Sequence, residues 1–148
     1  MGFSVSGSAA IIFASLFLAF GMWHTAASNS FERVTDAQGD RTDHVLETAN
    51  TDINVTSATY DAENDTLEIH VDNTGAAQLS LSGTDLLIDG NYEADWQGSA
   101  DVAGDSTTDV WPPTKDLVVT LGSVTSQPDH VKLVAPSGVA ATAEVTAA

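Results

Sequence analysis

Residues 67–72 read LEIHVD, a stretch in which every second side chain is apolar. The apolar members are Leu67, Ile69 and Val71, and a polar residue follows each of them. Successive side chains of a β-strand point to opposite faces, so this pattern puts one face against a core and the other in solvent. The stretch therefore predicts a half-buried strand, and with it a β-rich fold for this part of the chain.

The segment before this stretch predicts a second strand with an irregularity. Ile53 and Val55 alternate with polar residues, and the alternation resumes out of step at Ala58 and Tyr60. A shift of one residue in a period of two is typical of a β-bulge. Residues 61–65, DAEND, predict the turn that joins the two strands.

The segments after it continue the β pattern to the end of the chain. Asp89-Gly90 is a hairpin signal. Further short apolar segments lie at 79–81, 86–88, 92–96, 110–111, 117–121, 131–134 and 139–145. About six to eight short strands with regular turn signals predict an antiparallel β-sandwich of immunoglobulin-like type over residues 51–148. The chain has no cysteine, so the immunoglobulin disulfide is absent.

The beginning of the chain is of a different kind, because residues 1–31 contain no Asp, Glu, Lys or Arg. The apolar side chains expected to hold a helix in the bilayer are Ile11, Ile12, Phe13, Leu16, Phe17, Leu18, Phe20 and Trp23. One central Asp would cost about 3 kcal/mol, comparable to the whole gain from these side chains. The sequence thus predicts a transmembrane α-helix over residues 1–28.

We expect this helix to stay attached as a single-pass anchor in the cell membrane. A secretory signal begins with basic residues, and the opening MGFS has none. Basic residues are too few to set the orientation, but sequons at Asn54 and Asn64 are possible N-glycosylation sites and favour an extracellular C-terminal domain.

Residues 29–50 are expected to form a helical extension or stalk between anchor and sandwich. Phe31, Val34, Val45 and Leu46 have helical spacing, whereas residues 38–40, QGD, interrupt it. We predict a helix to about Ala37, followed by a looser stalk.

The charge balance is strongly acidic, with 21 Asp and Glu against 4 Lys and Arg and a net charge of −17. Such a surface repels phosphate, which excludes nucleic acid as a partner. A hydrophobic content of 43% argues against disorder. The composition instead favours adaptation to molar salt as the reason for the acidity. The Debye length there is about 3 Å, so repulsion between the carboxylates is mostly screened.

No residue pattern predicts catalysis, a cofactor or a metal site, so we expect a protein that is not an enzyme. The four histidines are scattered, and no nucleophile or zinc motif is present. The carboxylates of residues 61–65 lack the glycine and distal glutamate of a calcium loop. Tyr92, Trp96 and Trp111 either form a partner-binding patch or, in the case of the tryptophans, fill the core under a loop.

Four stretches resemble the haloarchaeal archaellum accessory protein family called FlaF or ArlF. They are residues 1–8 (MGFSVSGS), 29–37 (NSFERVTDA), 71–75 (VDNTG) and 86–90 (LLIDG). The resemblance implies a stator component that supports motility by gripping the surface layer with its β-sandwich. It also implies a sister stator protein, FlaG or ArlG, as partner, and a homo-oligomer formed through the β domain.

Two other functions fit the same plan of anchor and head. An archaellin or pilin-like filament subunit shares the apolar helix and β head, but should be trimmed at its start. A membrane-anchored surface binding module should instead present a concave aromatic site near Trp96 and Trp111.

Overall fold

The computed structural model describes residues 2–148, with the backbone alone for 2–5. Met1, where the expected anchor begins, lies outside the described residues. The chain divides into two compact units, Met1–Asp43 and His44–Ala148.

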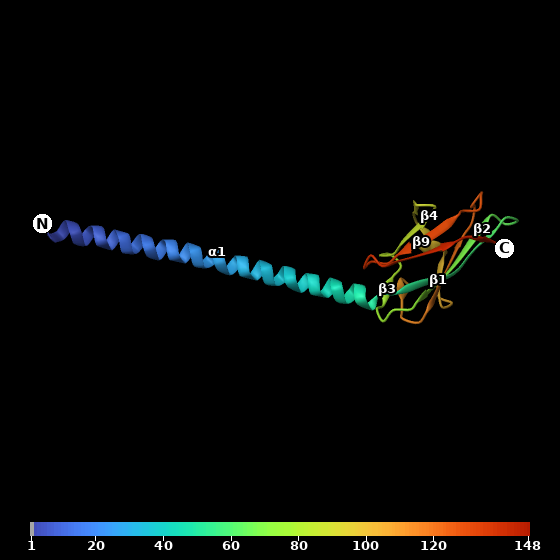
Figure 1. Ribbon diagram of the computed structural model, residues 1–148, viewed down its shortest axis with the longest axis horizontal. Helices are drawn as coiled ribbons and strands as arrows, with labels where there is room; N and C mark the ends of the chain where they lie inside the picture. The colour runs from blue at the N-terminus through green and yellow to red at the C-terminus, as the bar shows by residue number, and fades with distance from the viewer. Residues whose placement is uncertain (1) are drawn as a thin grey trace. The chain divides into compact units, whose positions relative to one another are not determined.

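The N-terminal part of the chain is one α-helix, α1 (Gly2–Asn50), drawn from blue to green in Figure 1. The predicted break at residues 38–40 is therefore wrong, as is the looser stalk after Ala37. Gly39 lies inside the helix, and the Thr42 hydroxyl donates to the Gln38 carbonyl at 2.9 Å. A single glycine costs a helix about 1 kcal/mol relative to alanine, which the hydrogen bonds on either side can outweigh.

Helix α1 contains a stretch long and apolar enough to cross a membrane, within Ser6–Asn50. None of the side chains in that stretch is buried by the rest of the chain. The large apolar side chains predicted for the anchor are all exposed: Ile11, Ile12, Phe13, Leu16, Phe17, Leu18, Phe20 and Trp23. An exposed apolar surface of this kind is compatible with a lipid bilayer, and the anchor itself stays a prediction.

The remainder is β-structure. The strands are β1 (Ile53–Asp61), β2 (Thr66–Asn73), β3 (Leu79–Ser80), β4 (Asp85–Ile88), β5 (Asn91–Glu93), β6 (Ala100–Val102), β7 (Val110–Trp111), β8 (Asp116–Leu121), β9 (His130–Val134), β10 (Ala140–Glu144) and β11 (Thr146–Ala147). One sheet has the order β11-β1-β2-β8-β6, a second the order β10-β9-β4-β5, and β3 pairs with β7. Between the strands of residues 53–147 all pairings are antiparallel except β1–β11.

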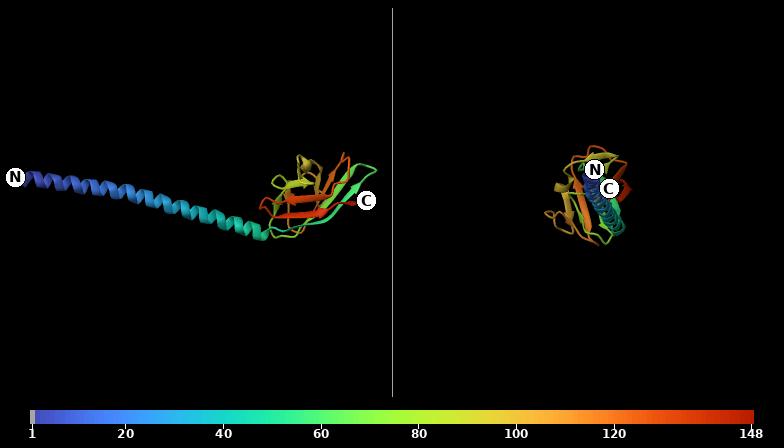
Figure 2. Two further views of the ribbon diagram at one scale, coloured as in Figure 1. Left: turned by 45° about the horizontal axis from the view of Figure 1, so that its top comes forward. Right: turned by 90° about the vertical axis from the view of Figure 1, so that its left-hand side faces the viewer.

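The two larger sheets enclose a single hydrophobic core, which confirms the predicted antiparallel β-sandwich. The first sheet contributes Leu67, Ile69, Val71, Leu117 and Val119, all fully buried. The second contributes Leu86, Val131 and Leu133, also fully buried. The C-terminal strand β11, red in Figure 2, lies beside β1 in green and closes that edge of the first sheet.

Two local predictions are confirmed in detail. The register between β1 and β2 shifts between Val55 and Ser57, which is the predicted bulge. Asp89 and Gly90, with φ of 49° and 80°, form the hairpin turn between β4 and β5. Positive φ at both central residues is the geometry of a type I′ turn, which suits the twist of the flanking strands. A 3₁₀ turn, Trp96–Ser99, was not predicted.

Candidate functional site

The histidines of residues 44–130 lie apart from one another in the structure. Among the described residues, no three His, Asp or Glu side chains are placed to hold a metal ion. The ring of His70 lies 2.5 Å from the carboxylate of its neighbour Glu68 on the same strand. His130 is exposed on β9, and His44 lies in α1, so the three side chains belong to separate elements.

The acidic turns use their carboxylates for their own backbone. The amide of Asn64 donates to Asp61 at 2.6 Å, and the backbone N–H of Glu63 donates at 2.8 Å. These bonds hold the pKa of the Asp61 carboxyl below its usual range. In the same way the backbone N–H and the hydroxyl of Thr107 lower the pKa of Asp105. Both carboxylates therefore stabilise turns as anions.

Tyr60 connects the turn of residues 61–65 to the loop that contains Val124. Its hydroxyl donates to the Val124 carbonyl at 2.9 Å and lies 3.3 Å from Asp65 Oδ1. Burial, followed by the nearby charge of Asp65, raises the pKa of the Tyr60 phenol. The phenol is neutral at physiological pH, so this contact is structural.

The structure does not bring Tyr92, Trp96 and Trp111 together as an exposed patch. Trp96 is 1% exposed and Trp111 is fully buried, whereas Tyr92 is 61% exposed on β5. The indole N–H of Trp111 donates to the Lys115 carbonyl at 2.8 Å, and that of Trp96 has no partner. Both tryptophans belong to the core, so neither offers its ring to a partner.

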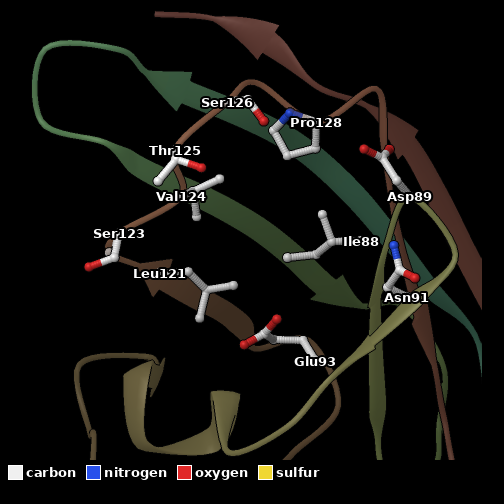
Figure 3. Close-up of a pocket in the computed structure, with 11 residues that line it drawn as sticks. Ile88, Asp89, Asn91, Glu93, Leu121, Ser123, Val124, Thr125, Ser126 and Pro128 are labelled. Atoms are coloured by element: carbon white, nitrogen blue, oxygen red, sulfur yellow. The ribbon is translucent and has the colours of Figure 1, made fainter.

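An open hollow of roughly 380 Å³ lies at one end of the sandwich. In Figure 3 the side chains of Ile88 and Leu121 point toward one another across it, with Glu93 below and Val124 above. Small hydroxyl residues of the loop 122–126 line its far side. Its lining combines apolar side chains with hydroxyl groups and the carboxylates of Asp89 and Glu93, and contains no aromatic side chain of the kind that a sugar-binding module uses.

The two predicted sequons are both accessible. Asn54 is exposed on β1, and Asn64 is exposed in the turn after it. N-glycosylation at either position stays a prediction.

The most specific constellation lies where the last residues of α1 meet the sandwich, within the unit His44–Ala148. The last carbonyl groups of a helix have no partner inside the helix. Here the carbonyl of Asn50 accepts from the N–H groups of Ala76 and Ala77, at 2.8 and 2.9 Å. The carbonyl of Asp52 accepts from Thr74 and Gly75, at 3.0 and 2.9 Å. We call residues 73–77 the clamp; the four donors belong to its residues 74–77.

Gly75 makes the close approach of the clamp possible. A Cβ atom on this residue would lie 2.5 Å from the Asn50 carbonyl oxygen and 2.5 Å from the Asp52 nitrogen. Cβ atoms do not occur at such distances from backbone, so any other residue would push the clamp away from the end of the helix. Thr51 lies buried between the two accepting residues, and its hydroxyl donates to the Glu47 carbonyl at 2.8 Å.

Asn73 holds the clamp in shape from inside the core. Its side chain is 1% exposed; its Nδ2 donates to the carbonyls of Ala77 and Trp111, and its Oδ1 accepts from the Gly75 N–H. A buried amide that satisfies three backbone groups replaces the hydrogen bonds that a regular strand would supply. The clamp is thereby tied to β7, deep in the sandwich.

Sequence reasoning missed the clamp. Asn73, Thr74 and Gly75 stood out only as part of a family resemblance. Nothing in their hydrophobic period shows that their N–H groups reach Asn50 and Asp52. The one local signal is Asn73 followed two residues later by Gly75, residue types that are typical of turns.

Comparison with family models and with curated proteins finds no match. Among solved structures, the archaellum periplasmic stator protein FlaG from Sulfolobus acidocaldarius is 17% identical, covering 63% of this chain and 97% of that one, with a TM-score of 0.39. The complex of FlaF and FlaG from the same organism is 15% identical, covering 62% and 85%, with a TM-score of 0.41.

A third similar structure is the CARDB domain of PF1109 from Pyrococcus furiosus, 15% identical, covering 66% of this chain and 94% of that one, with a TM-score of 0.38. Similarities of this size do not assign a function.

Proposed function

We propose that this chain is a stator component of the archaellum, which holds the rotary motor in place through a membrane anchor and a β-sandwich that grips the surface layer. A stator transmits force between two attachments and performs no chemistry. The chain offers an apolar helix and a folded head as candidates for these two attachments, and among the described residues no three His, Asp or Glu side chains are placed to hold a metal ion.

The observation that carries this proposal is the clamp on the end of α1. Force on the head passes to the helix through residues 50–52, and a free linker there would let the head turn. Four backbone hydrogen bonds hold Asn50 and Asp52 against residues 74–77, and Asn73 ties those residues to the core. Each such bond contributes about 0.5–1.5 kcal/mol, and load would act on all four together.

The resemblance of the chain to the FlaF or ArlF family supports the same role. Two of the four resembling stretches, residues 1–8 and 29–37, lie in the helix, and one, residues 71–75, includes the clamp. On this proposal the head lies outside the cell, and its partners are the surface-layer protein and a sister stator protein. The acidic surface, with −17 on the whole chain, suits a salt-rich exterior.

Gene deletion with complementation tests the proposal. We expect the deletion strain to lack filaments or to carry filaments that do not turn, and the wild-type chain to restore swimming. A chain without residues 1–28 is expected to fail, whereas alanine at His44, His70 or His130 should restore motility. Normal swimming of the deletion strain would exclude the stator role.

Surface-layer binding needs its own measurement. The full-length chain in detergent, at molar salt, is expected to be retained on a matrix that carries surface-layer protein. It should pass through the same matrix without that protein. If the head alone is not retained and the helix alone is, the surface-layer binding site lies in the helix, which would contradict the proposal. Filaments built from this chain as their bulk component would instead favour the filament-subunit alternative.

A further inference from the structure

The short strand β5 is an open edge of the second sheet. In the order β10-β9-β4-β5 it pairs with β4, and no other strand of the described residues is hydrogen-bonded to its far side. A strand in this position presents backbone N–H and C=O groups that another chain can use. Extended segments of other proteins add to sheets at open edges of this kind.

The register shows which backbone groups of β5 face outward. The hydrogen bonds of successive residues in an antiparallel sheet alternate between the two neighbouring strands. The Asp89 N–H donates to the His130 carbonyl at 3.0 Å, so Leu87, two residues earlier, also directs its backbone groups to β9. Tyr92 of β5 stands opposite Leu87 and is therefore not hydrogen-bonded to β4. Its N–H and C=O point to the open side of the sheet.

The hollow beside β5 has room for a side chain of an added strand. Ile88 of β4 and Leu121 at the end of β8 face each other across it, so it lies between the two larger sheets (Figure 3). Asn91 and Glu93 line it from β5, whereas Tyr92 between them is 61% exposed. A strand added next to β5 would direct every second side chain into this space of roughly 380 Å³.

Glu93 decides which strands can add here. It stands opposite Leu86, a fully buried core residue, so its side chain is on the inward face of an edge strand. An inward carboxylate protects an edge from indiscriminate pairing, because an apolar strand would bury it without a partner. A strand with Lys or Arg at the facing position avoids this cost, since its cation pairs with the carboxylate. The aliphatic stem of that side chain can lie on Ile88 and Leu121.

We propose that β5 receives an extended segment of the surface-layer protein, which adds to the sheet as a further strand and places a Lys or Arg side chain in the hollow beside Glu93. The identity of the partner rests on the proposed function, whereas the edge, the hollow and its charge are features of this chain. A second copy of the chain fits poorly in this place. It would bring a further Glu93 carboxylate to a strand pair only three residues long, and like charges destabilise such a pair.

Proline at position 92 tests the strand addition. Tyr92→Pro removes an N–H that β4 does not use, so the hairpin keeps its hydrogen bonds, whereas the added strand loses one. With the full-length chain in detergent at molar salt, we expect its retention on immobilised surface-layer protein to fall several-fold. Tyr92→Ala keeps the backbone groups and should be retained like the wild type. Retention of Tyr92→Pro at the wild-type level would overturn the proposal.

Thr142→Pro is the matched control, on strand β10 at the opposite edge of the same sheet. The Ala135 N–H donates to the Val139 carbonyl at 2.8 Å, and steps of two along the register leave Thr142 with an N–H that β9 does not use. This variant should be retained like the wild type, and circular dichroism checks that both proline variants are folded. Equal losses at the two edges would show an effect that is not specific to β5, and would contradict the proposal.

Reversal of one charge tests the hollow independently of the backbone. Glu93→Lys puts a cation where the added segment is expected to bring its own, and should lower retention several-fold. Glu144→Lys makes the same change on β10 and should leave retention unchanged. A pair in direct contact is not abolished by molar salt, because its separation is comparable to the Debye length of about 3 Å. Equal retention of the two variants would contradict the role of Glu93.

The two proposals fail separately in these experiments. If the wild type is not retained, the proposed grip on the surface layer is wrong, and so is the proposed occupant of β5. If the wild type and Tyr92→Pro are retained equally, the grip lies elsewhere and only the strand addition is wrong. The chain has no cysteine of its own, so a disulfide-linked product of Tyr92→Cys can be assigned to position 92. Such a product at twice 15.4 kDa, formed without surface-layer protein, would show that a second copy occupies this edge and would contradict the proposal.

Discussion

The carbonyl oxygen of Asn50 occupies the space that a side chain on Gly75 would need, 2.5 Å from the position of its Cβ atom. The end of a 49-residue helix and a turn more than 20 residues later are thus in contact through backbone alone. Hydrogen bonds between backbone groups require the two backbones to approach closely. A single methyl group at position 75 is therefore enough to separate the turn from the end of the helix.

Gly75→Ala is expected to lower the free energy of unfolding of the sandwich by about 1–3 kcal/mol, as for other forced contacts in packed sites. Thermal unfolding of the full-length chain, followed by the circular dichroism of the β-structure, measures the change. Gly122→Ala is the control, because an added Cβ there meets nothing within 4 Å. A loss of stability equal to that of the control would show that the contact at Gly75 relaxes without cost.

The loss of folding stability at acid pH should depend in part on Asp61. Hydrogen bonds from Asn64 and Glu63 lower the pKa of this carboxyl in the folded state, whereas in the unfolded chain it is about 3.9. The folded state therefore binds the proton less well, so the carboxylate adds stability above the unfolded pKa. That stability is lost as the pH falls through the folded pKa.

Asp61→Ala is accordingly expected to be less stable than the wild type at pH 7, with the difference shrinking below about pH 4. Denaturant unfolding at a series of pH values measures it, and Glu93→Ala, which removes an acidic side chain outside this turn, is the comparison. A difference between Asp61→Ala and wild type that persists unchanged at pH 2 would contradict the assignment.

The strands were predictable because their signal is local. The alternation of residues 67–72, and its slip between Val55 and Ala58, follow from one buried face, and the structure has both the strand and the bulge. The helix through Gly39 was not predictable in this way. Whether a helix continues through one glycine depends on the hydrogen bonds that the residues before and after it make, and these are not visible in the local pattern. The clamp was missed for another reason: its donors are N–H groups, which every residue but proline carries.

The net charge of −17 predicts a strong dependence on salt. Between about 0.1 M and 1 M salt the Debye length falls from about 10 Å to about 3 Å, so the mutual repulsion of the carboxylates is screened. We expect the melting temperature to rise by at least about 4–8 °C over this range, which corresponds to about 1 kcal/mol for a domain of this size. A rise of the same size in sorbitol of equal osmolarity would show that screening is not the cause.

The two buried tryptophans should respond differently to replacement by phenylalanine. Trp111 donates its indole N–H to the Lys115 carbonyl at 2.8 Å, so Trp111→Phe loses both ring volume and a hydrogen bond. Trp96 has a buried N–H without a partner, so Trp96→Phe loses ring volume but removes a group that is costly to bury. Because an unmade buried hydrogen bond costs about 1–3 kcal/mol, Trp111→Phe is expected to be the more destabilising by that amount. Denaturant unfolding of the two variants side by side measures the difference, and equal losses would mean that the Trp96 indole is hydrogen-bonded in solution.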